Sequence, residues 1–591
     1  MAKSKEKAKP GTLGKVLRYI GRYKLLLPIS IFFALVSVAL TLYIPIIIGE
    51  VIDLIALFED GEAMNWGAIA SKLGLAAILI GITALSQWLM STVNNRIAFH
   101  VVRDIRNDAF KKVTKLPLSY IDTHSHGDTV NRVINDADQF AEGLLLGFTQ
   151  LFTGVLTIVG TLFFMLTINW IIALVVVVLT PMSLLVARFI GSRTHSMFGR
   201  RSKSEAEATS LINEMIGNQK AIKAFGYEDD AVARFGDANK QLEADTLQAT
   251  FFSSLVNPTT RFLSNVVYAA VALVGAFLAI STKDSALAFT VGNLSTLLAY
   301  TNQYTKPFNE ISGVIAEFQN ALACASRVLD LIEAEPEPSD EGAAVIGVAD
   351  GRIDIENMSF SYTDEKPLIE NMSLEVEPGM RVAIVGPTGC GKTTLINLLM
   401  RFYDVKEGSI RLDGKDIRKL TRHSLRENYG MVLQDTWLKA GTIRENIIMG
   451  KPDATDEEIV AAAKAAHSHS FIKRLKNGYD TVIGEGGEGL SQGQKQLLCI
   501  TRVMLAPPPV LILDEATSSI DTRTEIRIQK AFAELMRGRT SFIVAHRLST
   551  IKEADIILVM KDGNIVEKGT HDELLSRGGF YSHLYNSQFA H

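Results

Sequence analysis

The stretch Gly386-Pro387-Thr388-Gly389-Cys390-Gly391-Lys392-Thr393-Thr394 decides the fold of the region around it. A short apolar, β-branched run, Arg381–Val385, comes just before it, and apolar residues at helical spacing follow over 395–400. These flanks predict a buried parallel strand that turns through the glycines into a helix. Glycines in such a turn let successive backbone N–H groups converge on phosphate oxygens at the helix N-terminus. The stretch therefore predicts a binding site for a nucleoside triphosphate.

Two side chains of the same stretch strengthen this interpretation. Lys392 supplies a mobile positive charge for the β- and γ-phosphates, and the Thr393 hydroxyl is suited to binding Mg²⁺. The alternative is a glycine-rich turn without a ligand, which the Lys-Thr pair and both flanking elements disfavour. We expect the ATP-binding residues of the loop to be Gly386, Pro387, Thr388, Gly389, Cys390, Gly391, Lys392, Thr393 and Thr394.

The composition of the whole chain bounds its organisation and its partners. At 591 residues the chain is too long to fold around a single hydrophobic core of ordinary size, which predicts at least two domains. Its net charge of −4 argues against a nucleic-acid partner. The cysteines Cys324, Cys390 and Cys499 have no CxxC spacing, so we expect reduced thiols.

Apolar stretches of about 20 residues, long enough to cross a hydrocarbon core of about 30 Å, are concentrated in the first half. They predict six membrane spans, at residues 25–48, 68–93, 143–167, 170–190, 262–280 and 287–305. A basic segment, residues 1–24, precedes them without a small-residue cleavage site, so we expect it to be retained.

The distribution of basic residues predicts the orientation. The segments 94–141 and 191–255 are rich in Arg and Lys, whereas 49–67 contains neither. The positive-inside bias then places both termini and both long loops in the cytoplasm, in a multi-pass protein of the cell membrane. The long loops keep helical periodicity, which predicts helical hairpins with tips near Tyr120 and Tyr227. Such tips are either docking elements for a cytoplasmic domain or ordinary helical turns, and their matching positions favour docking.

Four polar residues of the last span recur at spacings of three and four and so share one helix face. They are candidates to line a substrate pathway, although hydrogen bonding between helices would explain them equally well. These residues are Asn293, Thr296, Tyr300 and Gln303.

An acidic, proline-bearing stretch, residues 333–348, predicts a linker. It would join a transmembrane domain at 25–332 to a nucleotide-binding domain at 349–591, in which strands and helices alternate in α/β style.

Two apolar runs of this second domain end in polar residues. The apolar run at residues 510–513 is followed directly by Asp514 and Glu515. As a buried strand, it would place both carboxylates at the carboxyl edge of a sheet, where ligands of open α/β sheets bind. Asp514 suits Mg²⁺, and Glu515 suits polarising the water that attacks the γ-phosphate. His546 follows another such run and is positioned to contact the γ-phosphate.

The sequence Leu490-Ser491-Gln492-Gly493-Gln494 precedes a helical run. A serine and a glycine with an exposed backbone at a helix start predict a second anion site. Because it is distant in sequence from the phosphate loop, a nucleotide would be held from two sides.

These elements, in this order and after six spans, resemble a half-transporter of the ATP-binding cassette (ABC) exporter family. The resemblance covers nearly the full chain, and the Leu-Ser-x-Gly-Gln element is highly specific to that superfamily. It implies an all-α membrane domain with six long helices, followed by an α/β P-loop ATPase domain.

The resemblance also assigns roles to further residues. It implies that Tyr362 stacks on adenine, that Gln434 reaches Mg²⁺ and the coupling helices, and that Glu485 senses the opposite membrane domain. The coupling helices themselves would lie at Leu118–Thr123 and 224–229. The residues expected to contact ATP across a dimer interface are Ser491, Gln492, Gly493, Gln494 and Asp521.

In this family two cassettes pair head to tail around ATP, so one chain is half a transporter. The usual signature has Gly where this chain has Gln492, a variant similar to that of heterodimers in which one site is impaired. Because Glu515, Gln434 and His546 are all present, we expect hydrolysis at the site built on this chain's own loop. A heterodimer is favoured over a homodimer.

The expected function is ATP-driven export of amphipathic drugs or lipids by alternating access, with ATP and Mg²⁺ as cofactors and a second half-transporter as partner. The main alternative is an ATP-gated channel or a regulatory subunit on the same fold. Six spans argue against a soluble P-loop enzyme, and a cassette fused to its membrane domain argues against an importer.

Overall fold

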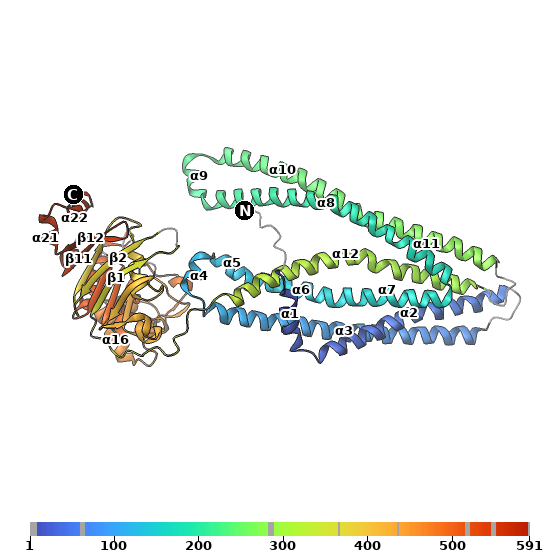
Figure 1. Cartoon of the computed structure of the whole chain (residues 1–591), viewed down its shortest axis with the longest axis horizontal. Coiled ribbons are helices and arrows are strands. Elements are labelled where there is room, and N and C mark those ends of the chain that lie inside the picture. The colour runs from blue at the N-terminus through green and yellow to red at the C-terminus, as the bar shows by residue number, and fades with distance from the viewer. Residues whose placement is uncertain are drawn as a thin grey trace. The chain divides into compact units, whose positions relative to one another are not determined.

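The structure is a computed structural model that describes residues 9–59, 65–281, 289–363, 367–433, 436–514, 520–544 and 551–588. The chain divides into two units. The first contains residues Met1–Leu116 and Thr123–Pro336, and the second contains Pro117–Asp122 together with Glu337–His591. The first unit is helical and the second is built on β-sheets with flanking helices (Figure 1), which confirms the predicted fold class.

The first unit consists of long helices joined by short connections. Two π-helical turns, η1 (Arg132–Asp136) and η2 (Gly147–Leu151), interrupt its third long helical stretch. The helices of this unit are α1 (Thr12–Gly21), α2 (Leu26–Glu59), α3 (Trp66–Val113), α5 (His126–Asn131), α6 (Ala137–Leu146), α7 (Phe152–Ile168), α8 (Trp170–Gly217), α9 (Gln219–Phe225), α10 (Glu228–Ser254), α11 (Val256–Ser281) and α12 (Val291–Glu333).

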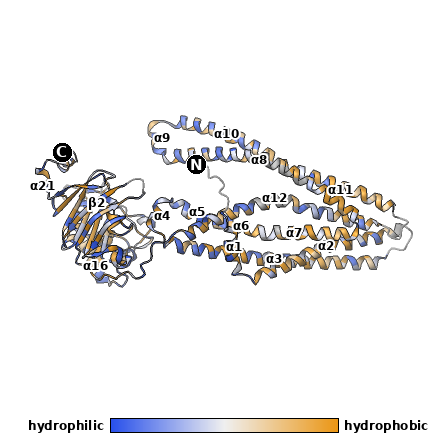
Figure 2. Cartoon of the chain, viewed as in Figure 1, coloured by the Kyte–Doolittle hydropathy of each residue, from blue (hydrophilic) through white to orange (hydrophobic). Residues whose placement is uncertain are grey.

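Three helical stretches in the described residues are long and apolar enough to cross a membrane: Leu26–Ala56, Trp66–Val113 and Glu228–Ser281. Two shorter apolar stretches lie at Phe152–Ile168, which is α7, and at Trp170–Met182, the start of α8. Figure 2 shows apolar residues along α2, α7 and α11, whereas α10 is mostly hydrophilic. Helix α12, which contains most of the sixth predicted span, does not meet the same criterion, so the number of six stays a prediction.

Helices α2 and α12 pack closely at glycines. A Cβ atom added at Gly292 would lie 2.1 Å from the Gly49 carbonyl oxygen, so neither helix tolerates a side chain there without moving. Asp53 of α2 accepts hydrogen bonds from the Gly292 N–H (2.7 Å) and the Thr290 hydroxyl (2.8 Å). These contacts satisfy donors at the N-terminus of α12 and hold it against α2.

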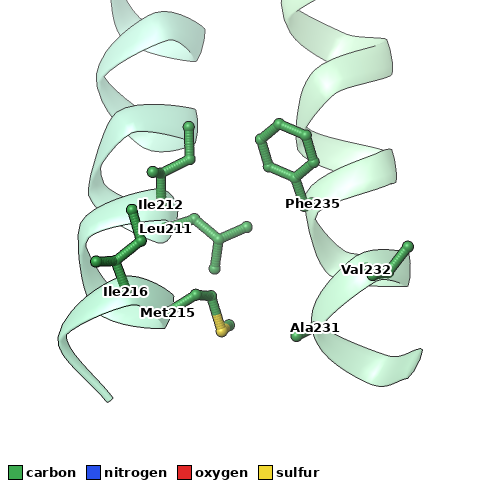
Figure 3. Close-up of a pocket in the computed structure, with 7 residues that line it drawn as sticks. All are labelled: Leu211, Ile212, Met215, Ile216, Ala231, Val232 and Phe235. Atoms are coloured by element: carbon green, nitrogen blue, oxygen red, sulfur yellow. The ribbon is translucent and has the colours of Figure 1, made fainter. Parts of the chain in front are cut away.

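The two predicted hairpin tips are both helical turns. Helix α4 (Leu118–Thr123) occupies the first, and α9 occupies the second, where Gly226 ends it with a left-handed φ of 61°. Helix α9 therefore begins five residues before the 224–229 segment expected from the resemblance. Near this tip, apolar side chains of α8 and α10 face one another across a groove (Figure 3), and Ile216 and Val232 are each 70% exposed.

The second unit contains a six-stranded sheet in the order β12-β11-β3-β10-β9-β6 and a four-stranded sheet in the order β2-β1-β4-β5. The strands of these sheets are β1 (Ile353–Phe360), β2 (Ile369–Val376), β3 (Arg381–Val385), β4 (Glu407–Leu412), β5 (Lys415–Asp416), β6 (Tyr429–Val432), β9 (Val510–Asp514), β10 (Thr540–Val544), β11 (Ile556–Lys561) and β12 (Asn564–Gly569). β7 (Gly441–Thr442) and β8 (Val482–Ile483) form a separate pair.

Apolar side chains from both faces of the central strands make two cores. One includes Val382 and Ile384, and the other includes Ala383 and Val385, all nearly inaccessible to solvent. This alternation explains why β3 is apolar throughout. The surrounding α-helices are α13 (Lys392–Leu399), α14 (Arg422–Glu427), α15 (Ile443–Ile447), α16 (Asp456–Ala465), α17 (His469–Ile472), α18 (Gln492–Leu505), α19 (Thr522–Met536), α21 (His571–Ser576) and α22 (Phe580–Gln588), with 3₁₀ turns at Ile417–Lys419, Ile448–Gly450, Gly478–Asp480 and Glu485–Gly487.

The acidic stretch expected to be a linker is attached to the second unit from Glu337 onward. The buried Arg422 side chain pairs with Asp340 (2.5 Å) and Glu337 (2.9 Å). Further along, Ala344 forms an isolated β-bridge with Leu420. The Ala349 backbone N–H donates a hydrogen bond to the side-chain oxygen of Asn428 (2.7 Å). Charge pairing and backbone hydrogen bonds thus hold this part of the segment, which composition alone did not indicate.

Candidate functional site

The phosphate loop joins β3 to α13 with backbone geometry that requires its glycines. Gly386 has φ of 155°, and a Cβ atom there would lie 2.2 Å from the Met560 carbonyl oxygen. Gly389 and Gly391 have φ of 84° and 100°, in the left-handed region that disfavours other residues. Gly391 is the N-cap residue of α13, so the loop presents backbone N–H groups at a helix start.

The loop's side chains divide into exposed and buried groups. Thr393 is exposed in the first turn of α13, whereas Thr394 is buried. The Lys392 ammonium lies 2.8 Å from the Gly386 carbonyl oxygen and 3.0 Å from that of Pro387, so it curls over the loop. A lysine in this position can move its charge from the carbonyls to a bound phosphate.

Tyr362 lies beside the phosphate loop and is half exposed. Its hydroxyl is 3.1 Å from the Thr394 hydroxyl, and 49% of the residue is exposed. Its ring meets Tyr403 edge-on, with centroids 5.1 Å apart and an interplanar angle of 89°. A half-exposed aromatic ring fixed by neighbouring rings suits stacking on a base.

Sequence reasoning missed Tyr403. Its hydroxyl donates to Asp122 of α4, and burial, followed by this hydrogen bond, raises the pKa of the tyrosine. Tyr403 therefore connects the ring of Tyr362 to the predicted first coupling helix. The signal in the sequence was the aromatic pair Phe402-Tyr403 shortly after the phosphate-loop helix, but nothing local indicated its partner.

The parallel strands end at the same level beside the loop. Asp514, the last residue of β9, is in register with Val544 of β10, which pairs in turn with Ile384 of β3. Asp514 therefore stands at the carboxyl edge of the sheet, separated by β10 from β3, the strand that leads into the phosphate loop. The predicted catalytic residues Glu515, His546 and Gln434 lie outside the described residues.

The second predicted anion site is a well-capped helix start. Ser491 is the N-cap of α18: its hydroxyl accepts from the Gln494 N–H (3.3 Å), and the Gln494 side chain accepts from the Ser491 N–H (2.9 Å). Ser491 and Gln492 are exposed, and the Gln492 amide donates to Thr436 (3.4 Å). This reciprocal capping box fixes the chain's entry into α18.

The sequence-based explanation for a glycine at position 493 was wrong. The sequence suggested that this glycine exposes the backbone, but the residue is buried against α19. A Cβ atom at Gly493 would lie 2.4 Å from the Thr524 methyl group and 3.0 Å from that of Ile520. The glycine is therefore required by close helix packing.

Substituting this glycine tests that explanation. We expect Gly493→Ala to force α18 from α19 at a cost of ~1–3 kcal/mol, the usual scale of overpacking, and to lower the thermal unfolding midpoint. Thr524→Ser removes the methyl group that the new Cβ would meet, so the double variant should recover most of the loss. Thermal unfolding of the purified protein measures both, with Thr524→Ser alone as the control. A double variant no more stable than Gly493→Ala would contradict the packing explanation.

Asp521 begins the helix that covers Gly493. Its carboxylate accepts from the Thr524 N–H (2.9 Å), and this hydrogen bond holds the pKa of Asp521 below its usual range. Glu485 lies in the 3₁₀ turn Glu485–Gly487, shortly before the signature. Asp521 thus lies at the N-cap of α19, and Glu485 lies in the turn that precedes the signature.

The four candidate pathway residues have different environments. Thr296 is buried and donates to the carbonyls of Pro45 (3.0 Å) and Gly292 (2.9 Å). Tyr300 is fully buried and donates to the Leu42 carbonyl (2.5 Å). Both contacts to α2 match the alternative of interhelical hydrogen bonding. Asn293 and Gln303 are half-buried, so they are better candidates for a pathway than the other two.

The possible ligands fit the groups present. Thr393 and Asp514 supply hydroxyl and carboxylate oxygens, which Mg²⁺ prefers, and the loop's N–H groups suit the phosphates of a nucleotide. No cluster of three or more His, Cys, Asp or Glu side chains suited to a metal occurs in the part of the chain that the structure describes. A metal held here would therefore depend on few protein ligands and on the nucleotide's own oxygens.

Comparison with known families identifies the class of protein. Residues 27–308 match the family described as ABC transporter transmembrane region, and residues 369–518 match the family described as ABC transporter. The chain belongs to the ABC transporters, with the membrane region and the ATPase on one polypeptide, which confirms the resemblance seen in the sequence. It is an ATPase of the ABC exporter type.

Individual relatives agree with this assignment. The chain is 43% identical over 521 residues to a fatty acid ABC transporter ATP-binding/permease protein of Mycobacterium tuberculosis, covering 88% of this chain and 82% of that protein. It is 35% identical over 583 residues to a putative multidrug export ATP-binding/permease protein of Staphylococcus aureus, covering 97% and 99%. The structure of a bacterial Atm1-family ABC exporter with ATP bound matches with a TM-score of 0.77 at 29% identity, covering 96% and 99%.

Proposed function

We propose that this chain exports amphipathic, lipid-like molecules, with fatty acids and hydrophobic drugs as the substrate classes to test first. The relatives named for fatty acid and multidrug export support this proposal. The apolar character of α2, α7 and α11 agrees with it.

The observation that supports ATP-driven transport is that the strands β3, β10 and β9 end together at the carboxyl edge of the central sheet. Gly391, Thr393 and Asp514 are brought there by parallel strands in register. In the proposed site Lys392 binds the phosphates, Tyr362 stacks on adenine, and Thr393, Asp514 and Gln434 hold Mg²⁺. Glu515 takes the proton from the attacking water and His546 orients the γ-phosphate. Mg²⁺ supplies charge neutralisation when bound.

The proposed transporter is a dimer in the cell membrane, with the ATPase unit in the cytoplasm. Ser491, Gln492, Gln494 and Asp521 would complete the partner's nucleotide site, and the buried Gly493 would keep the start of α18 close to α19. Gln492 in place of the usual glycine is the reason to expect a different second half-transporter. ATP binds the closed pair of cassettes better than the open pair, and this difference in affinity drives the change of access.

Reconstitution tests the proposal. We expect the complex in inside-out vesicles to accumulate a labelled fatty acid or hydrophobic amine when ATP and Mg²⁺ are added, and its ATPase rate to rise with that substrate. The chain should be assayed alone and with candidate partner half-transporters. A stable homodimer with full substrate-stimulated ATPase would refute the heterodimer, and nucleotide-gated ion conductance without uptake would favour a channel over a pump.

A further inference from the structure

An apolar cavity of about 220 Å³ lies in the first unit, away from the nucleotide site. It is bounded by α1, α6, α12 and the start of α7, which Figure 1 shows together in one part of the helical unit. Its walls are hydrophobic side chains and one glycine. The wall residues that matter most below are Leu13, Leu17, Phe140, Leu144, Phe318 and Leu322.

The wall made by α1 is fixed to the bundle. Lys15 pairs with Glu333 at the end of α12 (2.6 Å), and the Tyr19 hydroxyl donates to Asp108 of α3 (2.9 Å). The face of α1 that carries Val16 is buried. The cavity is therefore bounded by docked helices.

The opposite wall cannot close the space easily. A Cβ atom at Gly143 of α6 would lie 2.2 Å from the Ala321 side chain of α12, and one at Gly147 would lie 3.0 Å from the Phe318 ring. Helices α6 and α12 are thus already in contact, and further approach is blocked. A cavity that cannot collapse and has no polar lining favours an apolar occupant.

The exposed side chains of helix α1 indicate where the cavity lies relative to a lipid bilayer. Leu13 and Leu17 on its apolar side are 48% and 54% exposed. Arg18 on α1 and Lys24 in the turn that follows α1 are exposed, and neither has an ion-pair partner within the described residues. A helix with separate apolar and basic faces, just before the candidate span Leu26–Ala56, is suited to lie in the membrane interface.

The size of the cavity limits the kinds of ligand that can fit in it. Sites for drug-sized molecules usually have volumes of ~300–1,000 Å³, so a smaller apolar space holds a segment of a chain better than a whole molecule. The absence of polar groups among its lining residues disfavours a ligand that needs hydrogen bonds inside the cavity. The unpaired basic residues outside favour a negatively charged head group.

We propose that this cavity binds a segment of the acyl chain of an anionic phospholipid from the cytoplasmic leaflet, with Arg18 and Lys24 near its head group. The inference rests on the proposed function and on the predicted membrane orientation, in which the N-terminus lies on the cytoplasmic side with the ATPase unit. The lipid is a bound neighbour of α1 and α12 and is not transported cargo.

Photolabelling of the assembled transporter in lipid nanodiscs tests this proposal. The probe is phosphatidylglycerol with a diazirine on one acyl chain, and peptide mass spectrometry locates the adducts. We expect adducts concentrated on α1 and on the part of α12 around Phe318. Leu17→Trp should lower this labelling by at least about fivefold, because the indole fills the space that the chain needs.

Matched variants control for misfolding and for general lipid contact. Leu322→Trp fills the cavity from α12 and should give the same loss, whereas Leu25→Trp changes an exposed residue outside the lining (78% exposed) and should not. Arg18→Gln together with Lys24→Gln should reduce labelling by the anionic lipid more than labelling by phosphatidylcholine with the same photoreactive chain.

The other outcomes overturn the proposal. Labels spread evenly over the apolar helices and unaffected by either tryptophan would exclude a bound acyl chain. Equal labelling by both phospholipids would exclude the anionic preference. Displacement of the label by a free fatty acid but not by unlabelled phosphatidylglycerol would assign the cavity to cargo. Because labelling needs no ATP, its failure would leave the proposed export intact, and failed export would not alter the labelling.

Discussion

Lys392→Ala is expected to reduce ATP hydrolysis by ~10²–10³, the scale found when one positioned donor to a developing charge is removed. The Lys392 ammonium lies over the phosphate loop, 2.8 Å from the Gly386 carbonyl oxygen, where no other ammonium of the described residues approaches that oxygen within hydrogen-bonding distance. Its loss leaves the loop's N–H groups in place but removes the charge that attracts the β- and γ-phosphates. Titration with a fluorescent ATP analogue should show weaker binding as well as slower turnover.

Lys530→Ala is a suitable control for that substitution. Lys530 is exposed on α19 and should leave nucleotide affinity unchanged. If Lys392→Ala bound and hydrolysed ATP like the unmodified protein, the phosphate-binding role of this loop would be wrong.

Glu515→Gln is expected to slow hydrolysis by ~10²–10⁴, the usual range for a general base, while ATP binding persists. Glu515 directly follows Asp514 at the end of β9, the strand that lies between β10 and β6. The amide keeps the size of the side chain but cannot accept the proton from water. Phosphate release measures the rate, and nucleotide titration measures binding.

The two substitutions separate binding from chemistry. Lys392→Ala should affect both, whereas Glu515→Gln should affect only turnover. Glu534→Gln, an exposed change on α19, is the matched control for charge and should preserve the rate. A Glu515→Gln variant that hydrolyses at a near-normal rate would remove Glu515 from its assigned role.

Local sequence patterns were sufficient for several features of the nucleotide site. The apolar run before the phosphate loop, the glycines within it and the capping box at Ser491 each depend on residues within a few positions of one another. Backbone conformation and capping are short-range effects, so a single sequence contains the information needed to predict them.

Contacts between distant segments were not predictable in this way. Tyr403 bonds to Asp122, which lies 281 positions earlier, and Tyr362 bonds to Thr394 across 32 positions. Gly493 is required because Thr524 packs on it, although its sequence context suggested an exposed backbone. The spacing of Thr296 and Tyr300 predicted one helix face, but their partners on α2 came only from the packing of α12.

The sequence by itself determined that this protein has apolar helices followed by a nucleotide-binding α/β unit, and that the unit carries a phosphate loop and a capped signature helix. These features follow from residue periodicity and from the conformational limits of glycine and the capping residues. The tertiary structure alone decided which side chains meet: the ring of Tyr403 against that of Tyr362, the close approach of α18 to α19, and the cavity bounded by α1, α6, α12 and the start of α7. Such contacts depend on the path of the whole backbone, because packing joins surfaces that are far apart along the chain.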